Sequence, residues 1–256
     1  MNPVVLLATG ALLAFTVPVV VSVVWTKKKG ERFTTVLVGA ACFLLFAIVL
    51  EKPLQNVLVF PVQMGLPEHA VSRFLNARPV LWAFVLGLFP GLFEETGRLV
   101  AFKTLLRKRS NKETAVTFGL GYGGFEVMFI LGMTYVSYIV VYILIKSGAY
   151  RSFPEEVLPQ FFAIALEIDS FSAGTLALAV AERIFAVLFH TGLSIMVFFA
   201  CRDRKYSLYL LAVVLHTVLD FVACLSIPLW AVELIVAVSG TGVFLGAYRF
   251  LYLKRN

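Results

Sequence analysis

Seven segments of the chain are apolar over about the length that a helix needs to cross a bilayer, which is about 20 residues. They span residues 2–25, 34–51, 79–106, 113–146, 174–201, 206–226 and 229–252. Only 14% of the residues are charged, whereas a soluble domain has about 25%. The sequence therefore predicts an all-α, polytopic membrane helix bundle. We expect one integral membrane domain over residues 1–256, in the cell membrane and in contact with lipid.

The connections between these segments differ in charge. Four of them are basic: "KKKGER" (27–32), "RKRSNK" (107–112), "RDRK" (202–205) and the tail "LKRN" (253–256). The stretches from Glu51 to Arg78 and from Lys146 to Asp169 are mixed or acidic. Because basic loops stay in the cytoplasm, we expect the N-terminus outside and the C-terminus in the cytoplasm. The same loops account for the net charge of +7, so no nucleic-acid partner is predicted.

A short set of ionisable residues lies in the interior of four of the apolar segments. They are Glu94, Glu95, Arg98, Glu126, Glu182, Arg183, His190, His216 and Asp220. A charge near the bilayer centre costs at least a few kcal/mol and usually faces the interior of the protein. Four of these residues, on four different segments, lie 11 to 13 residues from a basic loop, which is roughly 16–20 Å at 1.5 Å per residue. This common depth of Glu94, Glu126, His190 and His216 favours one shared site over scattered structural residues.

Spacing and charge point to the chemistry of that site. Glu94 and Arg98 are four residues apart, as are His216 and Asp220, so each pair shares a helix face. Arg98 and Arg183 can neutralise only two of the five carboxylates. The other carboxylates must be protonated, solvated or bound to a cation. Two imidazoles beside surplus carboxylates suit a transition metal such as zinc, and a glutamate beside the metal can act as general base on water.

Other interpretations remain open at this point. The Glu94, Glu95 and Arg98 cluster is also typical of a structural ion pair that holds helices together. Intramembrane carboxylates, His and Arg also build the relays of proton- or cation-coupled transporters. A third interpretation is a non-catalytic membrane scaffold whose polar residues only connect helices.

The same residues resemble a known family. The motifs "FEETGR", "GYGGFE", "ER" with a histidine seven residues after the arginine, and "HTVLD" are similar to those of the YhfC-type intramembrane metalloproteases. This family is related to the larger clan of CAAX-prenyl proteases and bacteriocin-processing membrane enzymes. The resemblance covers about residues 79 to 225, which would place the catalytic helices within 79–226.

The resemblance implies roles for individual residues. The clan has a double glutamate followed by arginine, then a helix with Phe and His, then a His with Asn or Asp four residues later. Glu94 and Glu95 match the double glutamate, His190 the second motif, and His216 with Asp220 the last. By resemblance, Glu94 and His190 would activate water, while His216 and Asp220 would bind metal or stabilise the oxyanion.

Two departures limit what can be carried over. Arg98 follows Glu94 by four residues, where the clan has five, and Phe185 precedes His190 by five residues instead of four. The first departure moves the arginine around its helix, so the specificity of the CAAX enzymes is not carried over.

The sequence thus predicts an enzyme, an intramembrane peptidase that acts on a peptide or protein substrate in or at the membrane. Water would enter from the cytoplasmic side or through a lateral cavity. A divalent metal, zinc by expectation, is the predicted cofactor. The predicted catalytic residues are Glu94, Glu95, His190 and His216. The predicted metal ligands are Glu94, His190, His216 and Asp220, and the supporting residues are Arg98, Glu126, Glu182 and Arg183.

Overall fold

A computed structural model of the chain describes residues 2–254 and is helical throughout, with no strand in that range, so the all-α prediction is confirmed. The α-helices are α1 (Pro3–Lys29), α2 (Phe33–Phe43), α3 (Lys52–Val59), α4 (Ala70–Asn76), α5 (Pro79–Lys103), α6 (Glu113–Val127), α7 (Met133–Lys146), α8 (Leu158–Ser170), α9 (Ala173–Arg202), α10 (Ser207–Ala223) and α11 (Leu229–Ala247). The π-helical segments are η1 (Leu44–Glu51), η3 (Met128–Gly132) and η6 (Tyr248–Tyr252), and the short 3₁₀ segments are η2 (Pro61–Met64), η4 (Ala149–Ser152) and η5 (Glu155–Val157). Part of the predicted basic tail, Arg255 and Asn256, lies outside the described residues, as does Met1.

Six helical spans in the described chain are long and apolar enough to cross a membrane, and the chain is a multi-pass integral membrane protein. They run over Pro3–Lys29, Phe33–Val59, Pro79–Lys103, Glu113–Lys146, Ala173–Arg202 and Leu229–Tyr252. The other predicted crossing corresponds to α10, whose 17 residues rise only about 26 Å, less than the hydrocarbon core of about 30 Å. The count of seven crossings and the orientation of the termini stay predictions.

The second span is longer than the sequence suggested. It continues through η1 and α3 to Val59, whereas we expected it to end at Glu51. Pro53 has no backbone N–H and would crowd a preceding carbonyl in a regular helix, and the chain widens into the π-helix η1 just before it. Apolar residues resume after the charged pair Glu51 and Lys52, so the helix continues. Glu51 therefore lies within the span and not in a loop.

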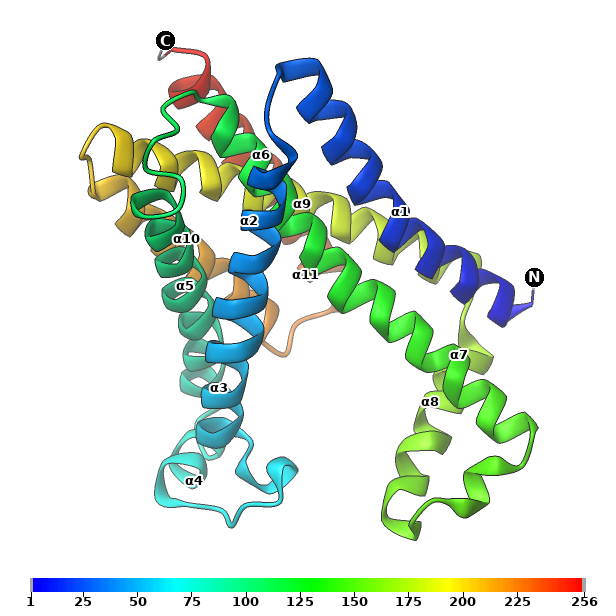
Figure 1. The fold of residues 1–256 in the computed structure, drawn as a ribbon. Helices are drawn as coiled ribbons and strands as arrows, with labels where there is room; N and C mark the ends of the chain where they lie inside the picture. Colours follow the sequence, from blue (N-terminus) through cyan, green and yellow to red (C-terminus); the bar gives the residue numbers. More distant parts are fainter. Residues whose placement is uncertain (1, 255–256) are drawn as a thin grey trace.

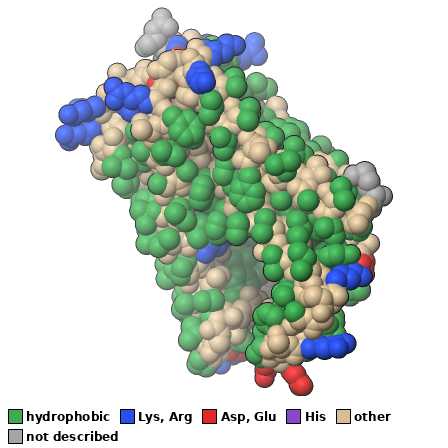
Figure 2. All heavy atoms as spheres, turned by 45° about the vertical axis from the view of Figure 1, so that its right-hand side comes forward, with side chains coloured by type: hydrophobic (Ala, Val, Ile, Leu, Met, Phe, Trp, Pro, Cys, Tyr) green, Lys and Arg blue, Asp and Glu red, His purple; other side chains and the backbone are tan. Residues whose placement is uncertain are grey.

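The helices pack closely at one end of the molecule and diverge toward the other. The loops "KKKGER", "RKRSNK" and "RDRK" gather at the packed end, which we call the basic end (Figure 1). In α9 every buried residue lies between Phe189 and Ala200, toward this end. Away from it, α3, α4 and α5 form one lobe and α7 and α8 another (Figure 1). Figure 2 shows a hollow between these lobes.

Helix α8 lies in a connection for which no helix was predicted. It packs against α7 through a small apolar cluster that contains Leu7, Tyr135 and Ile168. Ile168 is the one buried residue of α8, so most of its surface has no partner within the chain.

Glycines allow the site-bearing helices to approach one another. A Cβ at Gly87 of α5 would lie 2.6 Å from the carbonyl oxygen of Thr217 in α10. A Cβ at Gly119 of α6 would lie 2.7 Å from the Cα of Thr191 in α9. Both distances are shorter than a side chain can occupy, so only glycine permits these backbone contacts. The first contact brings Glu94 of α5 toward His216 of α10, and the second brings Glu126 of α6 toward His190 of α9.

Gly87→Ala should lower the thermal stability of the detergent-purified protein. The added methyl group would push α5 away from α10, and overpacking costs about 1–3 kcal/mol. The matched control is Gly242→Ala in α11, where a Cβ would meet nothing within 4 Å and alanine favours the helix by about 1 kcal/mol. The melting temperature should fall for Gly87→Ala alone. Equal melting temperatures for the two variants would contradict the close packing of α5 and α10.

Candidate active site

Four helices place their ionisable side chains in one buried cluster. Helix α5 contributes Glu94, Glu95 and Arg98, α6 contributes Glu126, α9 contributes His190, and α10 contributes His216. All six residues are buried, and Glu95 and Arg98 are completely inaccessible. The structure thus brings together the residues to which the sequence assigned a common depth.

Arg98 is the most highly connected member of the cluster. Its Nη1 donates to Glu95, its Nη2 to Nδ1 of His190 at 2.6 Å, and its Nε to Oγ of Ser194 at 3.3 Å. The guanidinium also lies 3.8 Å over the ring of Tyr122. Because a buried guanidinium is costly unless its donors are used, these contacts fix the relative positions of α5, α6 and α9.

His190 has both ring nitrogens engaged. Since arginine can only donate, Nδ1 accepts the hydrogen bond from Arg98. The other nitrogen, Nε2, lies 2.5 Å from a carboxylate oxygen of Glu126. Nε2 therefore carries the proton, and the lone pair of Nδ1 is directed toward Nη2 of Arg98.

His216 has the opposite arrangement. Its Nδ1 lies 2.8 Å from Oε1 of Glu95, so the proton is on Nδ1 and the lone pair is on Nε2. Nε2 lies 3.9 Å from Oε2 of Glu94 and 3.5 Å from Oδ2 of Asp220, and Asp220 is half-buried. A carboxylate on one imidazole nitrogen with the other nitrogen free is the usual surrounding of a metal-binding histidine.

Glu94 lies between the two histidines. Its Oε2 accepts a hydrogen bond of 3.0 Å from the hydroxyl of Tyr122. The same oxygen is 4.0 Å from Nδ1 of His190, 3.9 Å from Nε2 of His216 and 3.9 Å from Arg98. Glu94 thus lies near one nitrogen of each imidazole. Its neighbour Glu95 instead forms an ion pair with Arg98 and a hydrogen bond with His216.

The remaining predicted residues form an outer group next to His190. Arg183 donates to Oε1 of Glu126 at 3.1 Å and pairs with Glu182. Glu126 connects this pair to His190. The side chain of Glu182 is 30% exposed. This outer group therefore lies between the buried cluster and the end of the molecule where the helices diverge.

The donor set fits a divalent cation. Glu94, His190 and His216 each offer one ligand atom, and these atoms lie within 4.8 Å of one another. The separations of 3.5 to 4.0 Å around Nε2 of His216 and Oε2 of Glu94 are close to the roughly 3.3–3.6 Å between ligands of a tetrahedral zinc ion. One buried oxygen of Glu95 also has no hydrogen-bond partner. Holding a cation through Nδ1 of His190 would replace its hydrogen bond from Arg98.

Sequence reasoning missed three polar residues of this region. Tyr122 lies four residues before Glu126, and Ser194 four residues after His190, so helical spacing could have identified both. Glu51 was assigned to a loop, because the charged pair Glu51 and Lys52 resembled the end of a crossing. In the structure Glu51 is completely buried.

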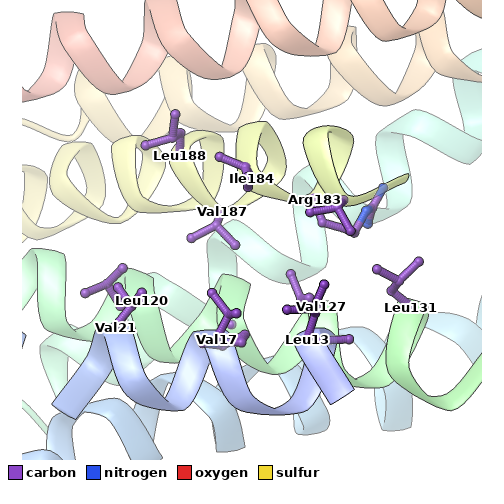
Figure 3. A pocket seen from close by; sticks show the side chains of 14 residues that line it. Leu13, Val17, Val21, Leu120, Val127, Leu131, Arg183, Ile184, Val187 and Leu188 are labelled. Carbon is purple, nitrogen blue, oxygen red and sulfur yellow. The ribbon is translucent and has the colours of Figure 1, made fainter. Parts of the chain in front are cut away.

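An apolar cavity of about 280 Å³ lies beside the cluster, between α1, α6 and α9. Aliphatic side chains line it, among them Val17, Leu120 and Val187, and Arg183 is the charged residue in its wall (Figure 3). Since Arg183 also contacts Glu126, the cavity adjoins the outer group of the site.

Comparison with known proteins identifies relatives. The model of the family described as "YhfC intramembrane metalloprotease" matches residues 13–240. The "Uncharacterized membrane protein YhfC" of Bacillus subtilis (strain 168) is 29% identical over 226 residues, which cover 87% of this chain and 84% of that protein. No solved structure matches the chain.

Arg98→Met should destabilise the protein strongly, because it leaves the carboxylate of Glu95 buried without its cation. Breaking a buried pair in this way typically costs about 3–5 kcal/mol. The double variant Glu95→Gln/Arg98→Met removes both charges and should recover part of the loss. Unfolding in detergent, followed by tryptophan fluorescence, measures both effects. A double variant no more stable than Arg98→Met would contradict the buried pair.

Proposed function

This chain belongs to the YhfC intramembrane metalloprotease family, and on that premise we propose that it hydrolyses a peptide bond of a membrane or membrane-associated substrate. The observation that carries the proposal is the position of Glu94, whose Oε2 lies within 4.0 Å of a lone-pair nitrogen of both His190 and His216. A carboxylate beside two imidazoles can activate water.

The residues that would hold a divalent cation are His216, His190 and Asp220. When bound there, the ion would polarise the scissile carbonyl and acidify a water molecule. We assign Asp220 as the binding carboxylate because Oδ2 lies 3.5 Å from Nε2 of His216. This assignment leaves Glu94 free to take a proton. Zinc is the ion that this mixture of imidazole and carboxylate suits best.

Glu94 is the proposed general base. The hydroxyl of Tyr122 holds Oε2 in place, and the carboxylate takes a proton from the attacking water. Glu94 then carries that proton and can give it to the nitrogen of the leaving amine. Tyr122 is thus a positioning residue for the base.

Glu95 and Arg98 have a different proposed role from Glu94. Oε1 of Glu95 keeps the proton of His216 on Nδ1, which leaves Nε2 available as a ligand. Arg98 neutralises Glu95 within a fully buried pair. Both act by orientation and charge, and we do not assign proton transfer to Glu95.

Glu126 orients His190 through Nε2 and is itself held by Arg183. This carboxylate–histidine contact keeps Nδ1 unprotonated, as Glu95 does for the other histidine. Nε2 of His216 is then a neutral donor toward the centre, and Nδ1 of His190 becomes one when a metal ion replaces its hydrogen bond from Arg98.

We propose that water and substrate reach the centre from the end where the helices diverge, or through the apolar cavity between α1, α6 and α9, which we call the lateral cavity. Toward the basic end the helices enclose a packed aromatic core that includes Phe102, Phe118 and Phe198, which leaves little room for entry. The partly exposed members of the site, Asp220 and Glu182, are instead found where the helices diverge. This favours entry where the helices diverge, or through the lateral cavity, over entry from the basic end.

The test compares cells that produce wild type, Glu94→Gln or the control Glu167→Gln, whose carboxylate is exposed on α8 and accepts from Tyr138. Mass spectrometry of membrane fractions would quantify new protein N-termini. Wild type and Glu167→Gln should produce the same set of termini. Glu94→Gln should reduce it by about 10²-fold or more, since general-base catalysis contributes about 10²–10⁴.

The same termini at wild-type levels in Glu94→Gln would overturn the peptidase proposal. The alternative functions would then be a proton- or cation-coupled transporter or a non-catalytic scaffold. Uptake assays in proteoliposomes would separate these two.

A further inference from the structure

Glu51 is a buried carboxylate to which the proposed mechanism gives no role. It lies in the π-helix η1, inside the second span, and is completely inaccessible. Neither carboxylate oxygen has a hydrogen-bond partner. The ammonium of Lys52 lies 3.3 Å from Oε1, but the side chain of Lys52 is itself 50% exposed. An ion pair with one partly solvated member compensates a buried carboxylate poorly.

The packing of the second span against α5 places Glu51 within about one helical turn of the level of Glu94. Nε2 of Gln55 donates to the carbonyl of Leu86 at 3.2 Å, a carbonyl that Pro90 leaves without its helical partner. Further along, a Cβ at Gly97 would lie 2.6 Å from the ring of Phe46. The two helices are therefore antiparallel.

Glu51 lies between Phe46 and Gln55 in the second span, as Glu94 lies between Leu86 and Gly97 in α5. The two carboxylates thus occupy the same section of the helix pair. At this level α5 also contacts α10 next to His216, because a Cβ at Gly91 would lie within 3 Å of Oγ1 of Thr217.

The charges around Nε2 of His216 are unbalanced. Glu94 and Asp220 place two carboxylates within 4 Å of this atom, and Glu51 adds a third carboxylate on the neighbouring section of the second span. Arg98 compensates them only in part, because it pairs with Glu95 and also lies 3.9 Å from Oε2 of Glu94. Lys52 supplies one further positive charge. The surplus of negative charge is what a divalent cation in this place would neutralise.

We propose that Glu51 is a positioning residue for the cation site, which it makes more attractive to a divalent ion by its negative charge, while Lys52 opposes it. The proposal rests on the cation of the proposed function. It assigns Glu51 no direct bond to the ion and no proton transfer.

A purely structural role predicts a different pattern. If the pair of Glu51 and Lys52 only stabilised the helix, removing either member would have the same sign of effect. An electrostatic role predicts opposite signs, because one residue attracts the cation and the other repels it. The comparison of Glu51→Gln with Lys52→Gln therefore separates the two roles. Glu51→Gln preserves side-chain length, and Lys52→Gln removes the charge at a half-exposed position.

The experiment measures zinc affinity of the full-length protein in detergent by competition with a chromophoric chelator. Glu51→Gln should weaken zinc binding by about 10–100-fold, as loss of a supporting residue typically does. Lys52→Gln should tighten it by about two- to tenfold. The control Glu167→Gln should bind zinc as wild type does.

Each outcome decides between the proposals. Unchanged affinity in Glu51→Gln, or weakening in both variants, would overturn the role of Glu51 and leave the proposed function intact. If wild type binds no zinc, the metal-dependent function itself fails, and the inference on Glu51 fails with it. If Glu51→Gln does not fold, the half-exposed Lys52 still allows the test, since only the electrostatic role predicts tighter binding in Lys52→Gln.

Discussion

The buried pair of Arg98 and Glu95 is the interaction on which the rest of the site depends. Both side chains are inaccessible, and charge inside a membrane protein is tolerated only when its polar groups have partners. Arg98 reaches α9 through His190 and Ser194, while Glu95 reaches α10 through His216. One ion pair thus sets the positions of three helices, and each histidine receives its tautomer from a contact to this pair.

Two adjacent glutamates on α5 therefore have different chemistry. Glu95 is neutralised by Arg98 and hydrogen-bonded to His216. Glu94 accepts one hydrogen bond from Tyr122 and lies within 4.0 Å of a nitrogen of each histidine. The surplus of carboxylates over arginines becomes concentrated beside Nε2 of His216. This is the physical reason for proposing a cation there, and it is how residues on four helices would act as one centre within the membrane.

Much of this arrangement could be predicted from the sequence. Apolar length gave the crossings, and helical spacing with depth from the basic loops grouped Glu94, His190 and His216. Hydrogen-bond partners could not be predicted, because the role of Glu95 depends on how α5 rotates against α10. Glu51 was missed because the widened π-helix before Pro53 extends a span that seemed to end at a charge. Helix α8 was missed because only one of its residues is buried.

The metal content of the detergent-purified protein tests the central claim most directly. Elemental mass spectrometry should find about one zinc per chain in wild type. His216→Ala should lose the zinc, with helicity by circular dichroism unchanged, and His190→Ala should retain less than wild type. Glu167→Gln should match wild type. A folded wild type without bound divalent metal, or a His216→Ala variant that keeps its full zinc content, would contradict the account.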